Sequence, residues 1–219
     1  MFSSLKPKFK GYFLLMRPPA IAIMGFATFV GQTIALKSIP ELQVILFPVL
    51  SSALVTASSF AVNDYFDFNI DRINKPEKPI PSGAVSKGSA LVFGVALFSA
   101  GFTASLATNL AATLLLLATY SLSVLYNTYG KKTGLLGNVI VSFSVSMAFV
   151  YGSLTAINSL EPMVFFVSFL SFFINLGREI VQGIQDMEGD RSEGVRSVAL
   201  VYGPRYAAAL GSASIAVPL

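Results

Sequence analysis

The chain has 219 residues, of which 54% are hydrophobic and 12% are charged, and its formal net charge is +4. Soluble domains carry about a quarter charged residues, so this composition indicates a membrane protein. Because Cys and His are both absent, a disulfide framework, a thiolate nucleophile, a His-ligated zinc and an imidazole base are excluded. Its chemistry must use carboxylates, Lys, Arg, Tyr, amides and bound ions.

Charge-free stretches long enough to cross a bilayer, which takes about 20 residues, follow one another along the chain. A polar segment, residues 64–87, separates the second stretch from the third, and its prolines and closing glycine predict a loop. The charge-free segment 88–130 is too long for one helix and is divided near Asn109. We predict an all-α bundle with six complete spans and the start of a seventh, at 18–36, 42–63, 88–108, 109–130, 135–156, 162–177 and from 206 onward. We expect this single domain, residues 1–219, to be incomplete at its C-terminus.

The basic residues are distributed unevenly among the predicted loops. Every Lys and Arg except Lys37 falls on the side that holds the N-terminus. By the positive-inside rule that side is cytoplasmic. We therefore predict a multi-pass protein of the cell membrane, with its N-terminus and its polar segments facing the cytoplasm.

The second predicted span ends in an acidic motif, Asn63-Asp64-Tyr65-Phe66-Asp67-Phe68-Asn69-Ile70-Asp71. At about 100° per residue, Asn63 and the three Asp residues share one face of a continuous helix. Neighbouring carboxylates repel by about 4 kcal/mol per pair at a protein-like effective dielectric, so this face needs cations. The motif therefore predicts a site for divalent metal.

The acidic motif returns 119 residues later, where Asp186 and Asp190 correspond to Asp67 and Asp71. Gly183 stands where the second copy would have its first Asp. Four predicted spans separate the copies, and because this number is even, both copies face the same compartment. We interpret the pattern as an internal parallel repeat whose two acidic ends share one metal site.

A pocket with acids and bases side by side suits Mg²⁺, which prefers six oxygens and commonly joins one or two carboxylates to substrate phosphates. A diphosphate bridged by Mg²⁺ to both acidic ends would satisfy the charges, and its departure would be assisted by metal ions and by cationic donors. Because the site opens into Phe-rich helices, the group attached to the diphosphate is expected to be a long hydrocarbon. The flanking cations are Arg72, Lys75, Lys78, Lys131, Lys132, Arg178, Arg191 and Arg196.

These residues resemble the UbiA superfamily of intramembrane prenyltransferases. The resemblance rests on the first acidic motif, on Lys75-Pro76-x-Lys78-Pro79-Ile80-Pro81-Ser82-Gly83, on Leu125-Tyr126 ahead of Lys131-Lys132 and Gly137-Asn138, and on Arg178-Glu179-Ile180 leading to Asp186 and Asp190. The residues of these motifs are most similar to those of the archaeal branch that transfers a geranylgeranyl group to geranylgeranylglyceryl phosphate, making an ether lipid.

The resemblance implies a helical bundle, typically of nine helices, with a central cavity that opens to the cytoplasm. It implies that two Mg²⁺ ions bind a prenyl diphosphate, geranylgeranyl diphosphate in that branch, whose ionisation yields an allylic cation that a lipophilic acceptor captures. The implied metal ligands are Asn63, Asp67, Asp71, Asp186 and Asp190, and Asp64 completes the implied catalytic set with the same four Asp residues. The implied substrate-binding residues are Arg17, Asn63, Arg72, Lys75, Lys78, Tyr126, Lys131, Lys132 and Arg178.

Other functions remain open at this point. The runner-up is an aromatic prenyltransferase acting on 4-hydroxybenzoate, naphthoate or a related quinone precursor. A cation-coupled transporter would carry ionisable groups near the middle of the membrane, whereas every acid here is expected at a cytoplasmic helix end or in a loop. A CDP-alcohol phosphotransferase would carry an Asp-Gly-x-x-Ala-Arg signature, which the chain lacks. Interfacial anchoring is the alternative role for Arg17, Tyr126, Lys131 and Lys132. The bilayer is an expected partner and nucleic acid is not.

Overall fold

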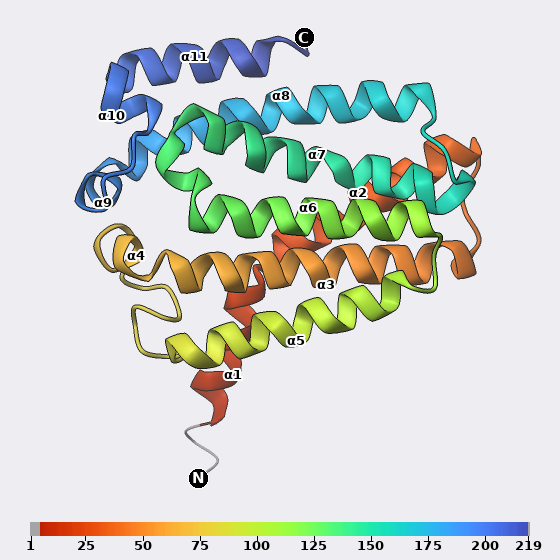
Figure 1. Ribbon diagram of the computed structural model, residues 1–219, viewed down its shortest axis with the longest axis horizontal. Helices are drawn as coiled ribbons and strands as arrows, with labels where there is room; N and C mark the ends of the chain where they lie inside the picture. Colours follow the sequence, from red (N-terminus) through yellow and green to blue (C-terminus); the bar gives the residue numbers. More distant parts are fainter. Residues whose placement is uncertain (1–4, 219) are drawn as a thin grey trace.

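The computed structural model describes residues 5–218, with side chains from Phe9 onward, and within this range the only regular elements are helices. Six of the helices are long and apolar enough to cross a membrane, namely α2, α3 and α5–α8, and Figure 1 shows them side by side in alternating directions. The elements are α1 (Leu5–Met16), α2 (Pro18–Leu36), α3 (Leu42–Phe66), α4 (Phe68–Asn74), α5 (Lys87–Ser105), α6 (Leu110–Thr128), the short 3₁₀ helix η2 (Gly130–Thr133), α7 (Leu135–Ile157), α8 (Pro162–Gln185), α9 (Met187–Ser192), α10 (Val198–Tyr202) and α11 (Pro204–Ala216).

The predicted all-α bundle with six spans is confirmed, but the predicted end of the sixth span is wrong. The charge at Arg178 was expected to end that span at Gly177, whereas α8 continues to Gln185. Arg178 and Glu179 form an ion pair with each other, and both line an internal cavity. The helix can continue because these two charges are not left unpaired against lipid.

The spacing of the first acidic motif predicted one continuous helix, but the structure shows a break within it. Helix α3 ends at Phe66, and α4 begins at Phe68 and turns away from α3 (Figure 1). Asp67 lies at the junction with φ −79° and ψ 4°, and backbone hydrogen bonds of 2.8 Å join Asp67 N to Asn63 O and Asp71 N to Asp67 O. The part of the predicted loop that precedes Lys75 is therefore helical, and the irregular loop spans residues 75–86.

Polar side chains cap helices on the side of the bundle opposite α4 and α9. The Asn109 side chain accepts a hydrogen bond from Ala112 N (2.9 Å), which caps α6, and its amide donates to Leu154 O of α7 (2.5 Å). Glu161 accepts hydrogen bonds from the backbone N–H groups of Met163 and Val164 and caps α8. These contacts satisfy backbone groups that would otherwise lack partners at the helix ends.

Small residues and hydroxyl groups bring the spans close together inside the bundle. A Cβ atom at Gly31 of α2 would collide with the Phe149 backbone of α7, so the two helices depend on glycine for their close approach. Buried hydroxyls join α3 to its neighbours through a hydrogen bond between Ser51 and Tyr151 (2.6 Å) and another that Thr28 donates to Ser52 (2.9 Å). In the membrane these bonds replace water as partners for the polar groups.

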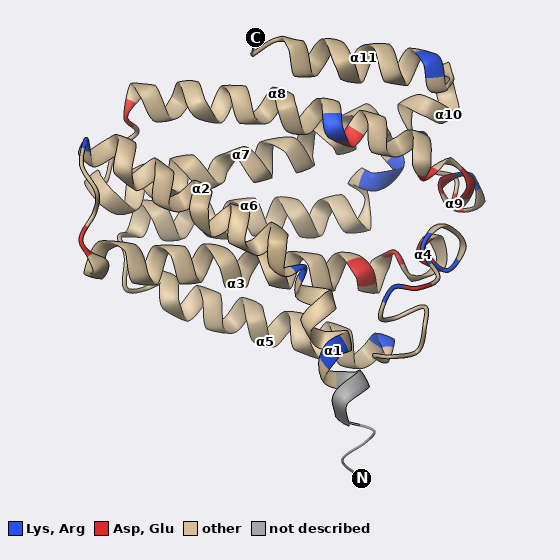
Figure 2. Cartoon of the chain, turned by 180° about the vertical axis from the view of Figure 1, so that it is seen from behind, with Lys and Arg blue, Asp and Glu red and all other residues tan. Residues whose placement is uncertain are grey.

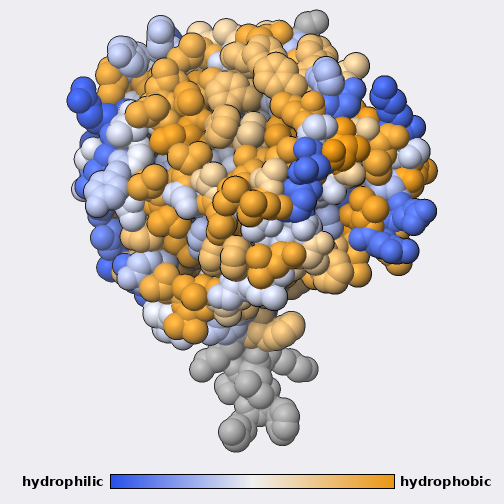
Figure 3. All heavy atoms as spheres, turned by 45° about the vertical axis from the view of Figure 1, so that its right-hand side comes forward, coloured by the Kyte–Doolittle hydropathy of each residue, from blue (hydrophilic) through white to orange (hydrophobic). Residues whose placement is uncertain are grey.

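The surface separates into an apolar flank and one charged end. Many large apolar side chains are exposed on the spans, as expected for contact with lipid, and Figure 3 shows them covering much of one side. Figure 2 shows Lys, Arg, Asp and Glu gathered at the end of the bundle that carries α4 and α9. This charged end contains both acidic motifs.

Candidate active site

A cavity of about 780 Å³ lies inside the bundle and reaches the charged end. Its walls come from α2, α3, α6, α7 and α8, and residues of α4, η2, α9, α10 and the adjoining loops complete the lining. The charged lining residues are Arg17, Asp67, Asp71, Lys75, Lys78, Lys131, Arg178, Glu179, Asp186 and Asp190. The deeper lining is apolar with scattered hydroxyls and includes Ser52, Val55, Ser59, Leu116, Ser123, Ser144 and Tyr151.

Two cations pair with Asp64 and Asp71 of the first acidic motif. Lys78 Nζ lies 2.7 Å from Asp71 Oδ2 and 3.0 Å from Asp64 Oδ1, so one ammonium serves two buried carboxylates. Arg17 Nη2 lies 2.6 Å from the same Asp64 oxygen, and the Arg17 guanidinium also lies over the Phe60 ring, 4.5 Å from its centroid. Arg17 adopts a left-handed backbone conformation, φ 53°, between α1 and α2. Asp64 therefore holds Arg17 and Lys78 in position.

The second acidic motif is joined to the loop that follows the first. Lys75 Nζ lies 2.8 Å from Asp186 Oδ1 and 3.1 Å from Asp186 Oδ2, so its ammonium contacts both oxygens of that carboxylate. Asn74 donates to the Asp186 carbonyl (3.0 Å) and accepts from Gly189 N (2.9 Å). These contacts attach α4 to α9, so the two acidic ends form one wall of the cavity.

Asp67 and Asp190 line the same cavity but differ in their partners. Lys131 Nζ lies 2.6 Å from Asp67 Oδ1. Asp190 is buried and has no ion pair with a described residue. Burial raises the pKa of its carboxyl to about 6, against a smaller opposing effect of Lys131. Burial likewise raises the pKa of Asp71, and the Lys78 ammonium counteracts part of that rise.

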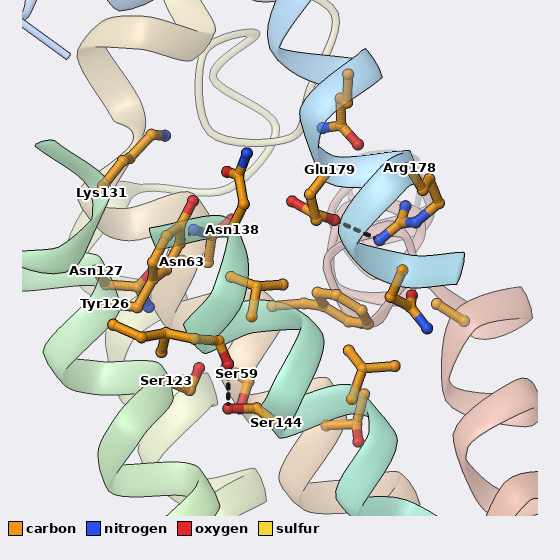
Figure 4. A pocket seen from close by; sticks show the side chains of 18 of the residues that line it. Ser59, Asn63, Ser123, Tyr126, Asn127, Lys131, Asn138, Ser144, Arg178 and Glu179 are labelled. Atoms are coloured by element: carbon orange, nitrogen blue, oxygen red, sulfur yellow. Dashed lines mark hydrogen bonds and ion pairs between the residues drawn. The ribbon is translucent and has the colours of Figure 1, made fainter. Parts of the chain in front are cut away.

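Amide and hydroxyl groups surround the charged residues on the α3, α6 and α7 walls. Asn63 donates a hydrogen bond to Asn127 Oδ1 (2.8 Å), and the buried Nδ2 of Asn127 has no partner among the described residues. Figure 4 shows Asn63, Asn127, Tyr126, Lys131 and Asn138 around the outer part of the cavity, with Ser59, Ser123 and Ser144 deeper inside.

The structure brings most of the sequence-predicted site residues to the cavity, but it leaves three outside the lining. Asp64 is covered by its two cations. Arg72 is exposed on α4, one residue beyond Asp71 and turned away from it, with its guanidinium 5.7 Å from the Phe68 ring centroid. Lys132 is also exposed. Adjacent residues differ in direction by about 100° in an α-helix and about 120° in a 3₁₀ helix, so each exposed cation points in another direction than the neighbour that lines the cavity.

The sequence-based reading also missed several residues that line the cavity. Asn127 and Glu179 are the most notable, because their polar groups face the interior. The expectation that every acid lies at a helix end or in a loop was wrong for Glu179, which lies within α8. A signal was present, since Glu179 and Asp186 are seven residues apart, and residues almost two turns apart share a helix face.

The donor groups fit Mg²⁺ bound together with phosphate. The described residues contain no group of three or more acidic side chains close enough to hold a metal ion by themselves. Magnesium commonly takes one or two carboxylates and completes its six oxygens with water and substrate phosphate. Suitable donors for this arrangement are the buried carboxylate of Asp190, which has no ion pair with a described residue, and the Asp186 carboxylate, which pairs with Lys75.

The fold and the site together define a multi-pass helical membrane protein whose internal cavity is charged at one end and apolar inside. Residues 24–219 match the model of the UbiA prenyltransferase family, and the chain belongs to this family. It is therefore a membrane-embedded prenyltransferase.

The most informative relatives cover nearly the whole chain. The digeranylgeranylglyceryl phosphate synthase of Thermococcus kodakarensis is 31% identical over 205 residues, which are 94% of this chain and 73% of the relative. A solved structure concerned with digeranylgeranylglyceryl phosphate synthase in membranes has a TM-score of 0.78 at 28% identity, covering 96% of this chain and 75% of the other. A UbiA homologue from Archaeoglobus fulgidus bound to DMAPP and Mg²⁺ has a TM-score of 0.75 at 20% identity, covering 95% and 75%.

Proposed function

We propose that this prenyltransferase transfers a geranylgeranyl group from geranylgeranyl diphosphate to geranylgeranylglyceryl phosphate, forming an ether lipid. The proposal is supported by the relative from Thermococcus kodakarensis, which carries the name of this activity. The observation that carries it is the cavity, whose charged end suits a diphosphate and whose apolar interior suits a long hydrocarbon. An aromatic acceptor remains the alternative to be tested.

Magnesium is the proposed cofactor, with two ions as in the sequence-based expectation. Asn63, Asp67, Asp71, Asp186 and Asp190 would hold it from the two acidic ends. Bound there, it would neutralise the diphosphate and act as a Lewis acid for its departure. The homologue from Archaeoglobus fulgidus that is bound to Mg²⁺ and DMAPP supports this choice.

The lysines and Arg17 are proposed to exchange partners when substrate binds. In the ligand-free arrangement, Lys75, Lys78 and Lys131 each contact an acidic side chain. Metal and diphosphate together would provide positive charge for the carboxylates and oxygens for the ammonium groups. The cations would then stabilise the negative charge that develops on the leaving diphosphate. Asp64 would keep Arg17 and Lys78 oriented towards it.

The hydrocarbon tail is proposed to lie along the deep part of the cavity. Asn63 and Ser52 both line it and are eleven residues apart on α3, which corresponds to an axial rise of about 16 Å. Tyr151 on α7, hydrogen-bonded to Ser51, stands at the same depth as the lower end of this stretch. Apolar neighbours would hold the tail away from water while its diphosphate stays at the charged end.

The charged end is proposed to face the cytoplasm, because the Lys and Arg residues are concentrated on that side of the predicted spans. We also propose an internal repeat in which α3 and α4 correspond to α8 and α9. Its expected consequence is that the two acidic ends bind one substrate jointly.

The function is tested with purified protein, Mg²⁺ and geranylgeranyl diphosphate, supplied in turn with geranylgeranylglyceryl phosphate, 4-hydroxybenzoate and a naphthoate. We expect ether product and released diphosphate with the glyceryl phosphate acceptor and none when EDTA replaces Mg²⁺. Prenylation of an aromatic acceptor alone would move the protein to the alternative. The absence of product with every acceptor would contradict the proposal.

A further inference from the structure

Glu179 is the cavity-lining acid that belongs to neither acidic motif. It lies on α8, seven residues before Asp186, so it shares the inner face of that helix with Asp186 about 10 Å deeper in the cavity. Figure 4 shows its carboxylate turned into the cavity and joined to Arg178. A charged group at this depth in a membrane helix is costly and calls for a functional explanation.

The carboxylate of Glu179 has one oxygen engaged and one available. Oε1 accepts a hydrogen bond from Arg178 Nη2 at 2.5 Å, and Oε2 accepts none from the part of the chain that the structure describes. The Glu179 side chain is 15% exposed, whereas that of Arg178 is 58% exposed and also reaches the cavity lining. The pair therefore offers a fixed anionic acceptor beside a guanidinium with free donors.

We propose that Glu179 is the general base for the acceptor hydroxyl and that Arg178 binds the acceptor phosphate. This inference rests on the proposed function. A prenyl diphosphate bound at Asp186 would direct its hydrocarbon chain into the cavity, so its reacting carbon C1 would lie on the side of Asp186 that faces Glu179, about 10 Å deeper. In a glyceryl phosphate the free hydroxyl is on the carbon next to the one that carries the phosphate. Adjacent residues that bind phosphate and hydroxyl match this spacing.

The transfer step balances without any further reactant. The bond between C1 and the diphosphate oxygen breaks, and both electrons leave with the diphosphate. A lone pair of the acceptor oxygen forms the new ether bond to C1. The hydroxyl becomes acidic as this bond forms, its proton passes to Glu179 Oε2, and the carboxylic acid returns the proton to water. A carboxylate is a sufficient base because the proton is lost together with bond formation.

The first experiment compares Glu179→Gln with wild type and with Glu77→Gln, which removes an exposed carboxylate outside the cavity. Each protein receives Mg²⁺, geranylgeranyl diphosphate and geranylgeranylglyceryl phosphate, and ether product is measured at varied concentrations of each substrate. Loss of a general base lowers rates by about 100-fold or more. We expect this loss in kcat of E179Q, with KM for the prenyl diphosphate unchanged and Glu77→Gln equal to wild type.

An acceptor analogue with a sulfhydryl in place of the hydroxyl separates a base from a structural role. A thiol has a pKa of about 8.5, far below the pKa of an alcohol hydroxyl, so it needs little help from a base. We expect E179Q to use the thiol within about 10-fold of the wild-type rate, a small part of the loss expected with the alcohol. An equal loss with both acceptors, or no loss with the alcohol, would overturn the proposal.

Two further variants complete the test. If Glu179→Gln does not fold, Glu179→Asp keeps the carboxylate but moves it, and the same selective loss with the alcohol is expected.

Arg178→Gln should raise KM for geranylgeranylglyceryl phosphate about 10-fold, the effect of one charged hydrogen bond. It should leave KM for the dephosphorylated acceptor unchanged. An equal change in KM for both acceptors would show that Arg178 does not bind the acceptor phosphate. If wild type forms no ether with any alcohol, the proposed function fails. Normal wild-type activity with normal E179Q activity refutes only the role of Glu179.

Discussion

The two acidic motifs have the same local form but different electrostatic surroundings. In each, a long span ends at an Asp with similar dihedral angles, φ −79° and ψ 4° at Asp67 and φ −93° and ψ 5° at Asp186. A short helix follows each of them and carries the last acid of its motif, Asp71 or Asp190. The acids of the first motif all have cations at ion-pair distance, whereas Asp190 has none among the described residues.

The two acidic ends therefore differ in how much negative charge each leaves unpaired before substrate arrives. The first motif is stabilised by cations that come from its own loop and from neighbouring elements. Among the described residues, the second motif pairs only with Lys75, which comes from the loop that follows the first motif. Its remaining negative charge is available to a metal ion, so it should depend more strongly on metal and diphosphate than the first motif does.

The largest expected effect comes from Asp67→Asn and Asp190→Asn, which keep side-chain shape and remove charge. Each should lower kcat about 1,000-fold, since metal-assisted stabilisation of a leaving group is worth several kcal/mol. Their effects on stability should differ. Without Mg²⁺, D190N should raise the melting temperature in detergent because it removes an unpaired buried charge, and D67N should lower it because Lys131 loses its partner. Equal shifts would contradict the asymmetry between the motifs.

The next effect concerns the cation that serves two acids. Lys78→Met leaves Asp64 and Asp71 buried without their shared ammonium, and removing one partner of a buried ion pair costs about 3 kcal/mol. Lys75→Met should cost less, because the Asp186 side chain is 18% exposed and retains more water. Chemical unfolding of both variants in detergent measures the difference. A larger loss for Lys75→Met would reverse the proposed ranking of the motifs.

A smaller effect is expected on substrate binding when the cation between the motifs is removed. Lys75→Gln should raise KM for the prenyl diphosphate about 10-fold, the equivalent of one charged hydrogen bond of about 1.5 kcal/mol. Arg205→Gln removes an exposed cation of α11 that does not line the cavity and serves as the matched control. Steady-state kinetics with varied prenyl diphosphate distinguishes the two, and an unchanged KM in Lys75→Gln would remove Lys75 from diphosphate binding.

The smallest effect is expected from making the second motif resemble the first. A Cβ atom at Gly183 would meet only Ser197 Cβ, at 3.7 Å, so a side chain can be accommodated there. Gly183→Asp should lower the Mg²⁺ concentration for half-maximal activity about threefold by adding one carboxylate near the metal. Gly183→Asn has the same shape without the charge and should not. An equal response of the two variants would indicate a steric effect.

The fold could be predicted from sequence where a local signal was sufficient. Pro18 and Lys37 bound the first charge-free stretch, and α2 begins and ends where expected. Helix breaks were harder to predict, because Phe66-Asp67-Phe68 carries no residue that must end a helix. The end of α8 was missed because charge alone was taken to mark a loop, and Arg178 and Glu179 are accommodated by pairing inside the bundle.

The sequence identified which residues form the candidate site more readily than which of them contact one another. Spacing within each motif identified Asp67, Asp71, Asp186 and Asp190, which all line the cavity. The contact of Lys75 with Asp186 joins residues 111 positions apart, and local spacing carries no information on such a contact. The same limit explains why adjacent cations, such as Lys131 and Lys132, could not be told apart before their directions were known.

We propose above all that the two acidic motifs bind one metal-bound diphosphate together. The most direct test of this proposal is a double-mutant cycle of Asp67→Asn and Asp190→Asn on the Mg²⁺-dependent binding of a non-reactive prenyl diphosphate analogue. Residues that act through one shared ligand are strongly non-additive. We predict that either single variant abolishes most of the Mg²⁺-dependent affinity and that the double variant binds no more weakly than the weaker single one. Additive losses would mean that the two motifs bind separately, which contradicts the account.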